Sequence, residues 1–308
     1  MNEKDVKSLS RAYMSPNETR RCNGRITDLA SLFLNFAPDE FDIDTVTDIA
    51  NGAGVSCEYA YAELFAARFG VDSSGRDRAF FRNYVVPMFN MLDVEEYLAD
   101  PYYKNIVIPD AKDGAWELKH ETLKPAEAFV CRDFIVTEDG RLIPQLGFFT
   151  MPFSFPAVLE GGREWMTLMP NETVTTMPAI KAARGKVLTY GLGLGYFAYM
   201  ASEKDDVASV TVVERDRSVI DLFSRHILPQ FPHKEKIDIV RSDAFEYASN
   251  VAPGEEYDFV FADFWHDAGD GRDLYLKMKE YEKYSQTSEY MYWLEDTILC
   301  YLDRELWP

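Results

Sequence analysis

Apolar residues recur at helical spacing through the first third of the chain. Apolar positions three or four residues apart are typical of helices with one buried face. Gly70, directly after one such run, is predicted to end a helix, and Asp44 to cap the start of another. The predicted helices cover residues 26–36, 58–69 and 79–98, the last interrupted near Pro87. The pattern predicts an N-terminal helical domain over residues 1–115.

The pattern then becomes β-rich. Two apolar runs flank Asp139 and Gly140, and an Asp-Gly pair in this position predicts a β-hairpin. Pro144 lies in the second run, which predicts either an edge strand or a bulge there. A further β-rich stretch at 165–168 extends the region, so we predict a β-hairpin connector or lid over residues 116–180. The two hairpin runs are residues 128–136 and 141–149.

Strands and helices alternate after Lys181. Four short runs rich in Val and Ile are typical of parallel strands that are covered on both faces. Their order predicts right-handed βαβ units in an α/β fold, a Rossmann-like doubly wound parallel sheet over residues 181–308. The predicted strands are residues 186–191, 209–214, 236–242 and 257–263.

The segment after Asp263 has helical character, which predicts a sheet truncated after its fourth strand. The N-terminal region or a second subunit would then complete the substrate side, so a homodimer is left open. An aromatic and aliphatic stripe in this segment is predicted to be core or interface rather than ligand pocket. It comprises Tyr290, Trp293, Ile298 and Tyr301.

Each of the four predicted strands ends in a glycine turn or an acid. Because the carboxyl ends of parallel strands share one edge, where such sheets bind ligands, these residues predict a nucleotide site. Glycines allow a tight turn and a close approach of the backbone to the ligand. The positions are Gly191, Gly193, Gly195, Glu214, Asp243, Ala244 and Asp263.

Two observations narrow the type of nucleotide by exclusion. Tyr196 stands where the dinucleotide fingerprint has a third small residue, which argues against NAD. No GxxxxGK[ST] sequence is present, so a P-loop is excluded.

Four segments resemble the class I S-adenosylmethionine-dependent methyltransferases, and among them the spermidine-synthase-like branch. They are VLTYGLGLG, VTVVERDRSVIDL, IVRSDAFEYA and YDFVFADFW. The resemblance implies S-adenosylmethionine as the cofactor, with its methionine part beside the three glycines. It also implies that Glu214 holds the ribose hydroxyls, that Asp243 and the Ala244 backbone bind adenine, and that Asp263 lies near the sulfonium.

The predicted function is methyl transfer to an unidentified small molecule. Two alternatives stay open, namely an aminopropyl or alkyl transferase of the polyamine-synthase type and a non-catalytic adenosyl-ligand-binding protein. Tyr190, Leu194 and His266 occupy places where related enzymes carry acids. The last two departures separate the chain from the polyamine synthases.

Asp263 and His266 are the predicted catalytic residues. His266 would act as a base, although a helix-capping or exposed loop position is an equal alternative. Phe264 and Trp265 would add aromatic faces, which favour a cation such as a sulfonium. Residues 164–166 and 170–172 are the predicted lid. Within it, Glu172 would bind the amino group of the ligand, or else would only stabilise a helix N-terminus.

The formal charge of -20 argues against nucleic acid and anionic membranes as partners, because no basic cluster is present. A small-molecule acceptor fits this charge, and a cationic one fits it best. Residues 45–66 resemble a helix-turn-helix, but Glu58 and Glu63 suit a phosphate backbone poorly. A packed helical pair explains the same pattern.

The remaining features concern location and metals. Four widely spaced cysteines with no CxxC pair predict reduced thiols and no metal site. The first 24 residues contain no apolar core of the signal-peptide type, and no run is long and apolar enough to span a bilayer. We therefore expect a cytoplasmic protein.

Overall fold

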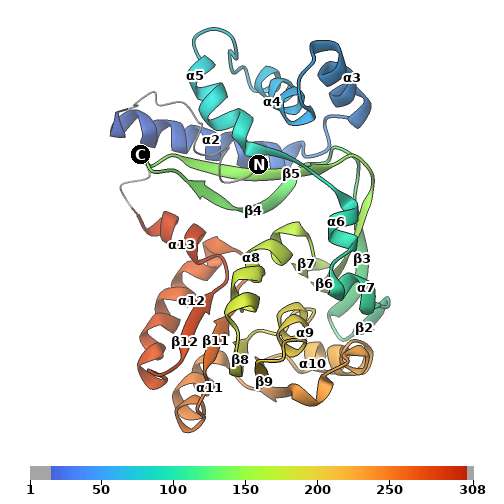
Figure 1. Cartoon of the computed structure of the whole chain (residues 1–308), viewed down its shortest axis with the longest axis vertical. Helices are drawn as coiled ribbons and strands as arrows, with labels where there is room; N and C mark the ends of the chain where they lie inside the picture. Colours follow the sequence, from blue (N-terminus) through green and yellow to red (C-terminus); the bar gives the residue numbers. More distant parts are fainter. Residues whose placement is uncertain (1–14, 304–308) are drawn as a thin grey trace. The chain divides into compact units, whose positions relative to one another are not determined.

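The computed structural model describes residues 15–303, which divide into two compact units (Figure 1). The contacts group the chain differently from the predicted segments 1–115, 116–180 and 181–308. The cause is that the β-rich middle region contributes strands to both units. Residues 1–14, on which much of the signal-peptide expectation rests, lie outside the described part. The first unit contains residues 15–94, 122–153 and 299–303, and the second contains residues 95–121 and 154–298.

Three helices open the first unit, each begun by a side chain that accepts a hydrogen bond from a backbone N–H of the first turn. They are α2 (Pro16–Phe36), α3 (Ile43–Ala53) and α4 (Cys57–Arg68), capped by Ser15, Asp42 and Ser56. The predicted cap Asp44 is therefore wrong by two residues, because Asp42 accepts from the N–H of Thr45 at 2.8 Å. Gly70 follows α4 with φ of +65°, as predicted for a helix end.

The pair α3 and α4 matches the segment that resembles a helix-turn-helix. Gly54 adopts a left-handed conformation in the turn between them. One face of α4 is buried in the core of the unit, through Tyr61, Phe65 and three alanines. Packing thus accounts for this pattern, whereas DNA binding remains untested.

The long helix predicted over 79–98 is broken into short pieces, since part of it pairs with a sheet. Residues 89–92 form a strand parallel to the second strand of the hairpin, so the helix prediction is wrong there. The pieces are α5 (Arg78–Phe80), a π-helical turn η1 (Phe81–Val85), a 3-10 turn η2 (Val86–Met88), β1 (Phe89–Leu92) and α6 (Val94–Leu98).

The predicted hairpin is confirmed as β4 (Phe129–Val136) and β5 (Leu142–Phe149), which pair antiparallel. The strand order β1-β5-β4 makes β5 central, so the edge position considered for Pro144 is wrong. The bulge is confirmed, because the register shifts between the pairs Arg132–Gln145 and Ile135–Ile143. The bulge allows Pro144, which has no backbone N–H, to lie in the central strand of this sheet.

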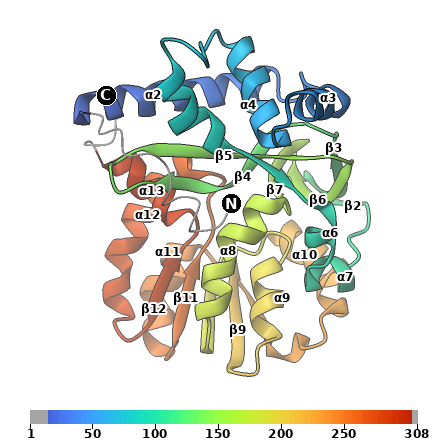
Figure 2. The ribbon, with the colours of Figure 1, turned by 45° about the horizontal axis from the view of Figure 1, so that its top comes forward.

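The second unit contains the predicted parallel sheet, with all neighbouring strands parallel. It runs in the order β10-β9-β8-β11-β12, with the reversal of a doubly wound fold between β8 and β11. Figure 2 shows its strands side by side. The strands are β8 (Gly185–Tyr190), β9 (Val207–Glu214), β10 (Ile237–Arg241), β11 (Phe259–Ala262) and β12 (Glu289–Tyr292).

The fifth strand corrects the predicted truncation. Residues 290–292 lie in a stretch predicted as helix, but the strand Glu289–Tyr292 pairs with β11, with Tyr290 opposite Val260. A strand of four residues is too short for its period to be separated from that of a helix. The sheet therefore continues beyond its fourth strand.

Helices connect these strands. With right-handed crossovers, α9 and α10 cover one face and α11 and α12 the other, because the strand order reverses at β8. Among residues 15–303, no helix is long and apolar enough to cross a membrane. The helices are α8 (Pro170–Ala182), α9 (Tyr196–Ser202), α10 (Arg217–His226), α11 (Ala244–Asn250), α12 (Ala268–Tyr281) and α13 (Glu295–Leu302).

A smaller sheet with the order β2-β3-β6-β7 lies almost wholly in the second unit. Its last hairpin turns at Gly161 and Gly162, which both have positive φ, and contains the stretch predicted as β at 165–168. The helix α7 (Pro101–Asn105) precedes it. The strands are β2 (Ala111–Asp113), β3 (Trp116–Leu123), β6 (Phe153–Glu160) and β7 (Arg163–Thr167).

Candidate functional site

A cavity of about 270 Å³ opens at the carboxyl edge of the parallel sheet, and every residue that lines it belongs to the second unit. It lies at the reversal point between β8 and β11, where doubly wound sheets bind ligands. All but one of the residues predicted for the site line this cavity. They are Glu172, Gly191, Gly193, Glu214, Asp243, Ala244, Asp263, Phe264, Trp265 and His266.

The glycine turn after β8 needs its glycines for two different reasons. A Cβ at Gly191, whose φ is +99°, would overlap the carbonyl oxygen of Asp263, so the turn and the end of β11 touch through backbone. Gly195 has a φ of +77°, and a Cβ there would strike the ring of Phe223 on α10. Gly195 is therefore needed for packing. The prediction that it belongs to the ligand site is wrong, because it does not line the cavity.

Tyr196 explains why the dinucleotide fingerprint is broken. Its buried ring packs edge-on against Tyr102 of α7, with ring centroids 5.6 Å apart, and its hydroxyl donates to Asp100 at 2.9 Å. A large side chain is thus accommodated where dinucleotide-binding folds need a small one.

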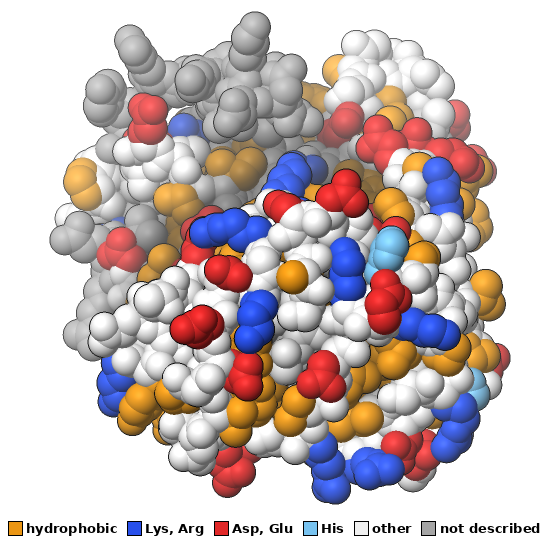
Figure 3. All heavy atoms as spheres, turned by 60° about the horizontal axis from the view of Figure 1, so that its bottom comes forward, with side chains coloured by type: hydrophobic (Ala, Val, Ile, Leu, Met, Phe, Trp, Pro, Cys, Tyr) orange, Lys and Arg blue, Asp and Glu red, His pale blue; other side chains and the backbone are white. Residues whose placement is uncertain are grey.

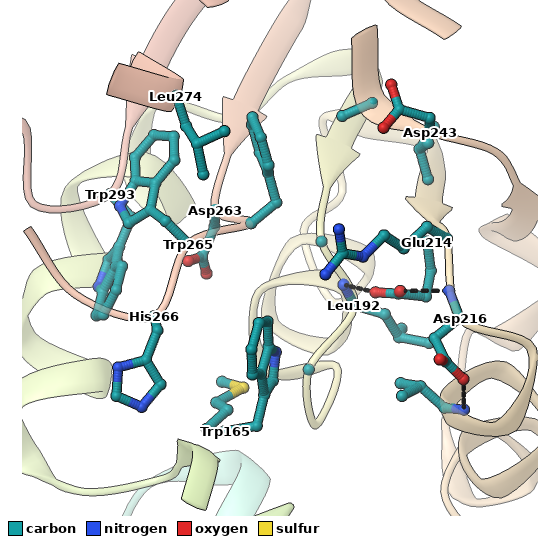
Figure 4. Close-up of a pocket in the computed structure, with 18 of the residues that line it drawn as sticks. Trp165, Leu192, Glu214, Asp216, Asp243, Asp263, Trp265, His266, Leu274 and Trp293 are labelled. Atoms are coloured by element: carbon teal, nitrogen blue, oxygen red, sulfur yellow. Dashed lines mark hydrogen bonds between the residues drawn. The ribbon is translucent and has the colours of Figure 1, made fainter. Parts of the chain in front are cut away.

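Glu214 ends β9 and is bound to the glycine turn. Its two carboxylate oxygens accept from the N–H of Leu192 at 3.3 Å and of Asp216 at 2.8 Å (Figure 4). Burial raises the pKa of Glu214, and the backbone N–H groups act against that rise. The carboxylate is therefore held at a fixed place on the cavity wall.

Asp243 caps α11 with one oxygen only. Its Oδ1 accepts from the N–H groups of Phe245 at 2.9 Å and Glu246 at 3.1 Å. Within residues 15–303, its Oδ2 has no hydrogen-bond partner. One acceptor on the cavity wall is thus left for a ligand donor, beside the backbone of Ala244.

Glu172 and Asp263 form a pair of carboxyl groups without a counter-charge. Burial raises the pKa of Asp263 to about 7. Burial, and then the negative charge of Asp263, hold the pKa of Glu172 well above its usual range. Neither carboxylate has a hydrogen bond or an ion pair within the described part of the chain. A cation bound beside them would lower the pKa of both carboxyl groups.

Glu172 has the position that both of its predicted roles require. It lies in the first turn of α8, where a negative charge is favoured, and it also lines the cavity.

His266 lines the cavity, but both of its ring nitrogens already have partners. Nε2 lies 3.2 Å from the carbonyl oxygen of Glu164, and Nδ1 lies 3.5 Å from a carboxylate oxygen of Asp267. The helix-capping alternative is wrong for His266, because Asp267 is the residue that caps α12. The Asp263 carboxylate, by contrast, has no such partner among the described residues.

Aromatic side chains that the sequence pattern did not connect to the site complete one wall. Four of the five tryptophans line the cavity. Trp293, predicted as core or interface, is one of them, and its Nε1 donates to Thr175 at 2.8 Å. Trp116 meets Trp165 edge-on, with ring centroids 5.9 Å apart. Neither Trp116 nor Trp293 lies near the glycine turn in sequence, so only the fold brings them there.

The cavity has two chemically different ends. Figure 4 shows Glu214, Leu192 and Asp216 on one side, and Asp263 with Trp265 on the other. The first end offers backbone and carboxylates suited to a nucleoside, and the second offers carboxylates and aromatic faces suited to a cation.

Positive charge is scarce around the cavity. Arg215 is the single Lys or Arg among the described residues that line it. On the face shown in Figure 3, Lys and Arg are interspersed with Asp and Glu rather than gathered in one patch. No group of three His, Cys, Asp or Glu within residues 15–303 is arranged to hold a metal ion.

Fold and site together define an α/β domain with a ligand cavity at the switch point of its parallel sheet. Residues 169–287 match the model of the spermine/spermidine synthase domain. This part of the chain therefore has the spermidine-synthase-like variant of the class I methyltransferase fold. No curated protein sequence matches the chain.

Among solved structures, the chain is similar to a Klebsiella pneumoniae protein described as an O-methyltransferase. Sequence identity is 14%, and the TM-score is 0.29. The likeness covers 36% of this chain and 49% of that one, so it spans about half of the other protein. At this TM-score it has no bearing on activity.

Proposed function

We propose that the second unit is a transferase that uses S-adenosylmethionine as the donor and methylates the amine of a small, cationic acceptor. The observation that carries the proposal is the uncompensated carboxyl pair, Glu172 and Asp263. Two carboxylates without a counter-charge are unfavourable by themselves and become favourable beside a sulfonium and an amine.

The other cavity residues fit an adenosyl ligand. Gly191 and Gly193 line the cavity, and Glu214 presents a fixed carboxylate for ribose hydroxyls. Asp243 keeps one free acceptor oxygen for an amino group such as that of adenine. These features support the roles implied by the resemblance for Glu214, Asp243 and Ala244.

Methyl transfer demands little covalent chemistry from the protein. When bound, the sulfonium donor supplies a methyl group to an unprotonated amine: the N–C bond would form as the S–C bond breaks, and S-adenosylhomocysteine would leave. The acceptor amine must first lose a proton, and Asp263, whose carboxylate lines the cavity without a hydrogen bond to another described residue, is placed to accept it. The tryptophans exclude water and hold the amine in line, and such positioning can supply much of the rate.

Aminopropyl transfer is the second candidate, and two observations favour it. The matching family model is that of spermine and spermidine synthases. In addition, Arg215 is the single basic side chain among the described lining residues, and it adjoins Glu214 at the nucleoside end. A donor without a tail carboxylate would avoid placing a negative charge beside Glu172 and Asp263.

Calorimetric titration tests the proposal. The ligands are S-adenosylmethionine, its decarboxylated form, S-adenosylhomocysteine and NAD, with Glu214→Ala as the variant that removes the ribose contact. We expect binding of the adenosyl sulfonium ligands, lost in the variant, and none of NAD. Preference for the decarboxylated ligand would replace methyl by aminopropyl transfer, and failure of every adenosyl ligand would refute the proposal.

Activity is tested separately, because a protein can bind the donor without catalysis. The purified chain is incubated with labelled S-adenosylmethionine and a panel of small amines, beside Asp263→Asn and His266→Gln. Transfer that is lost in Asp263→Asn and largely kept in His266→Gln agrees with the geometry. Binding without transfer to any amine would favour a non-catalytic adenosyl-binding protein.

A further inference from the structure

The strand β7 places the side chain of Met166 on the glycine turn. Its Sδ accepts from the N–H of Leu194 at 3.2 Å. A Cβ at Gly193 would collide with the same sulfur atom, so the thioether lies directly against the turn. Met166 also lines the cavity.

A bulge in β7 aims this side chain. Val158 pairs with Met166 and Leu159 with Glu164, so Trp165 has no partner on β6. Such a bulge redirects the side chains around it. Trp165 packs near His266, whose Nε2 contacts the carbonyl of Glu164. The two residues before Met166 therefore both contact His266 at the cavity.

We propose that Met166 is a gate for the donor tail. The inference rests on the proposed function, in which the amino-acid tail of the adenosyl ligand runs beside Gly191 and Gly193. In the structure the thioether of Met166 covers Gly193 and uses the Leu194 N–H. The tail of the ligand can take this place only after the Met166 side chain turns away.

The chemistry favours such an exchange. A thioether sulfur is a weak hydrogen-bond acceptor, so the Leu194 N–H gives up little when a carboxylate or water oxygen replaces it. Methionine has three rotatable bonds and moves readily between rotamers. The nucleoside end, at Glu214 and Asp243, requires no movement of Met166. The gate should therefore act on the tail alone.

Comparing the affinities of two thioether ligands distinguishes binding of the tail from binding of the nucleoside. S-Adenosylhomocysteine has the full amino-acid tail, and 5′-methylthioadenosine has only a methyl group in its place. Both are titrated calorimetrically into the full chain, into Met166→Ala and into Met166→Leu. Met151→Ala is the control, because Met151 is an exposed methionine that does not line the cavity.

We expect Met166→Ala to bind S-adenosylhomocysteine about five- to tenfold more tightly, with little change for 5′-methylthioadenosine. Met166→Leu keeps the bulk and should resemble the unchanged protein, as should Met151→Ala. If the alanine variant does not fold, Met166→Val removes the sulfur and the terminal methyl group while retaining a good strand former.

The outcomes separate this inference from the proposed function. If neither thioether binds any of the proteins, the proposed function fails. If both bind, but the ratio of their affinities is the same with and without the Met166 side chain, the gate is refuted. A loss of S-adenosylhomocysteine binding in Met166→Ala would also refute it, since Met166 would then be a ligand contact.

Discussion

Asp263 shows how a single residue connects stability with function. In the folded protein its pKa is about 7, whereas an unfolded aspartate titrates near 3.9. The folded state therefore binds the proton more tightly than the unfolded state. The stability of the fold decreases as the pH rises from about 4 to about 7, where Asp263 must ionise without a counter-charge. A residue retained at such a position is more easily explained by a ligand than by the fold.

Asp263→Asn should consequently stabilise the empty protein. We expect a gain of about 1–3 kcal/mol in the free energy of unfolding at pH 8 and almost none at pH 4. Urea denaturation at the two pH values measures it. Asp205→Asn, an exposed acid outside the cavity, is the matched control. An equal effect at both pH values, or a loss of stability at pH 8, would contradict the assigned pKa.

At the scale of elements, the site depends on how closely the β8 turn approaches the end of β11. The N–H of Asp263 donates to Tyr190 at 2.9 Å, and the N–H of Gly191 donates to Val213 at 2.9 Å. These backbone bonds extend the sheet by one residue at the reversal point. They bring the turn, Glu214 and Asp263 to one place, which explains why the sequence pattern of strand ends was informative.

Gly191→Ala should disrupt this junction. The added Cβ would overlap the Asp263 carbonyl, and the φ of +99° is strained for alanine, so we expect a loss of about 2 kcal/mol or more. Binding of S-adenosylhomocysteine should be lost with it. Gly254→Ala is the control, since a Cβ there meets nothing within 4 Å. Thermal unfolding and calorimetry check both variants, and full binding by Gly191→Ala would be inconsistent with this geometry.

On the scale of the whole molecule, the residues that line the cavity are not confined to the segment that matches the family model. The family match covers residues 169–287, but Trp116, Trp165 and Trp293 lie outside it. The nucleoside end is therefore built from the matched segment, and much of the aromatic wall from segments outside it. Acceptor choice should depend on those segments, so the family alone does not identify the acceptor.

Tryptophan emission should report ligand binding, because most of the tryptophans of the chain line one cavity. We expect S-adenosylmethionine to shift or quench a large part of the emission, with the same midpoint as calorimetry. Trp293→Phe should lose part of the signal. Calorimetric binding with unchanged emission would place the ligand elsewhere.

The sequence by itself determined the second unit in outline. Four of its parallel strands, the glycine turn and the acids at the strand ends follow from local patterns, since hydrophobic period and strand ends are properties of neighbouring residues. The same local information also predicted the β4–β5 hairpin and offered a bulge at Pro144 as one of two alternatives.

Only the tertiary structure decided which residues meet across the cavity. It assigned Gly195 to packing, placed Trp293 on the wall, and turned residues 289–292 into a strand. It also set Met166 against the glycine turn. These outcomes depend on contacts between residues far apart in the chain. Local propensity is a weak guide to such contacts, because packing and strand pairing outweigh it.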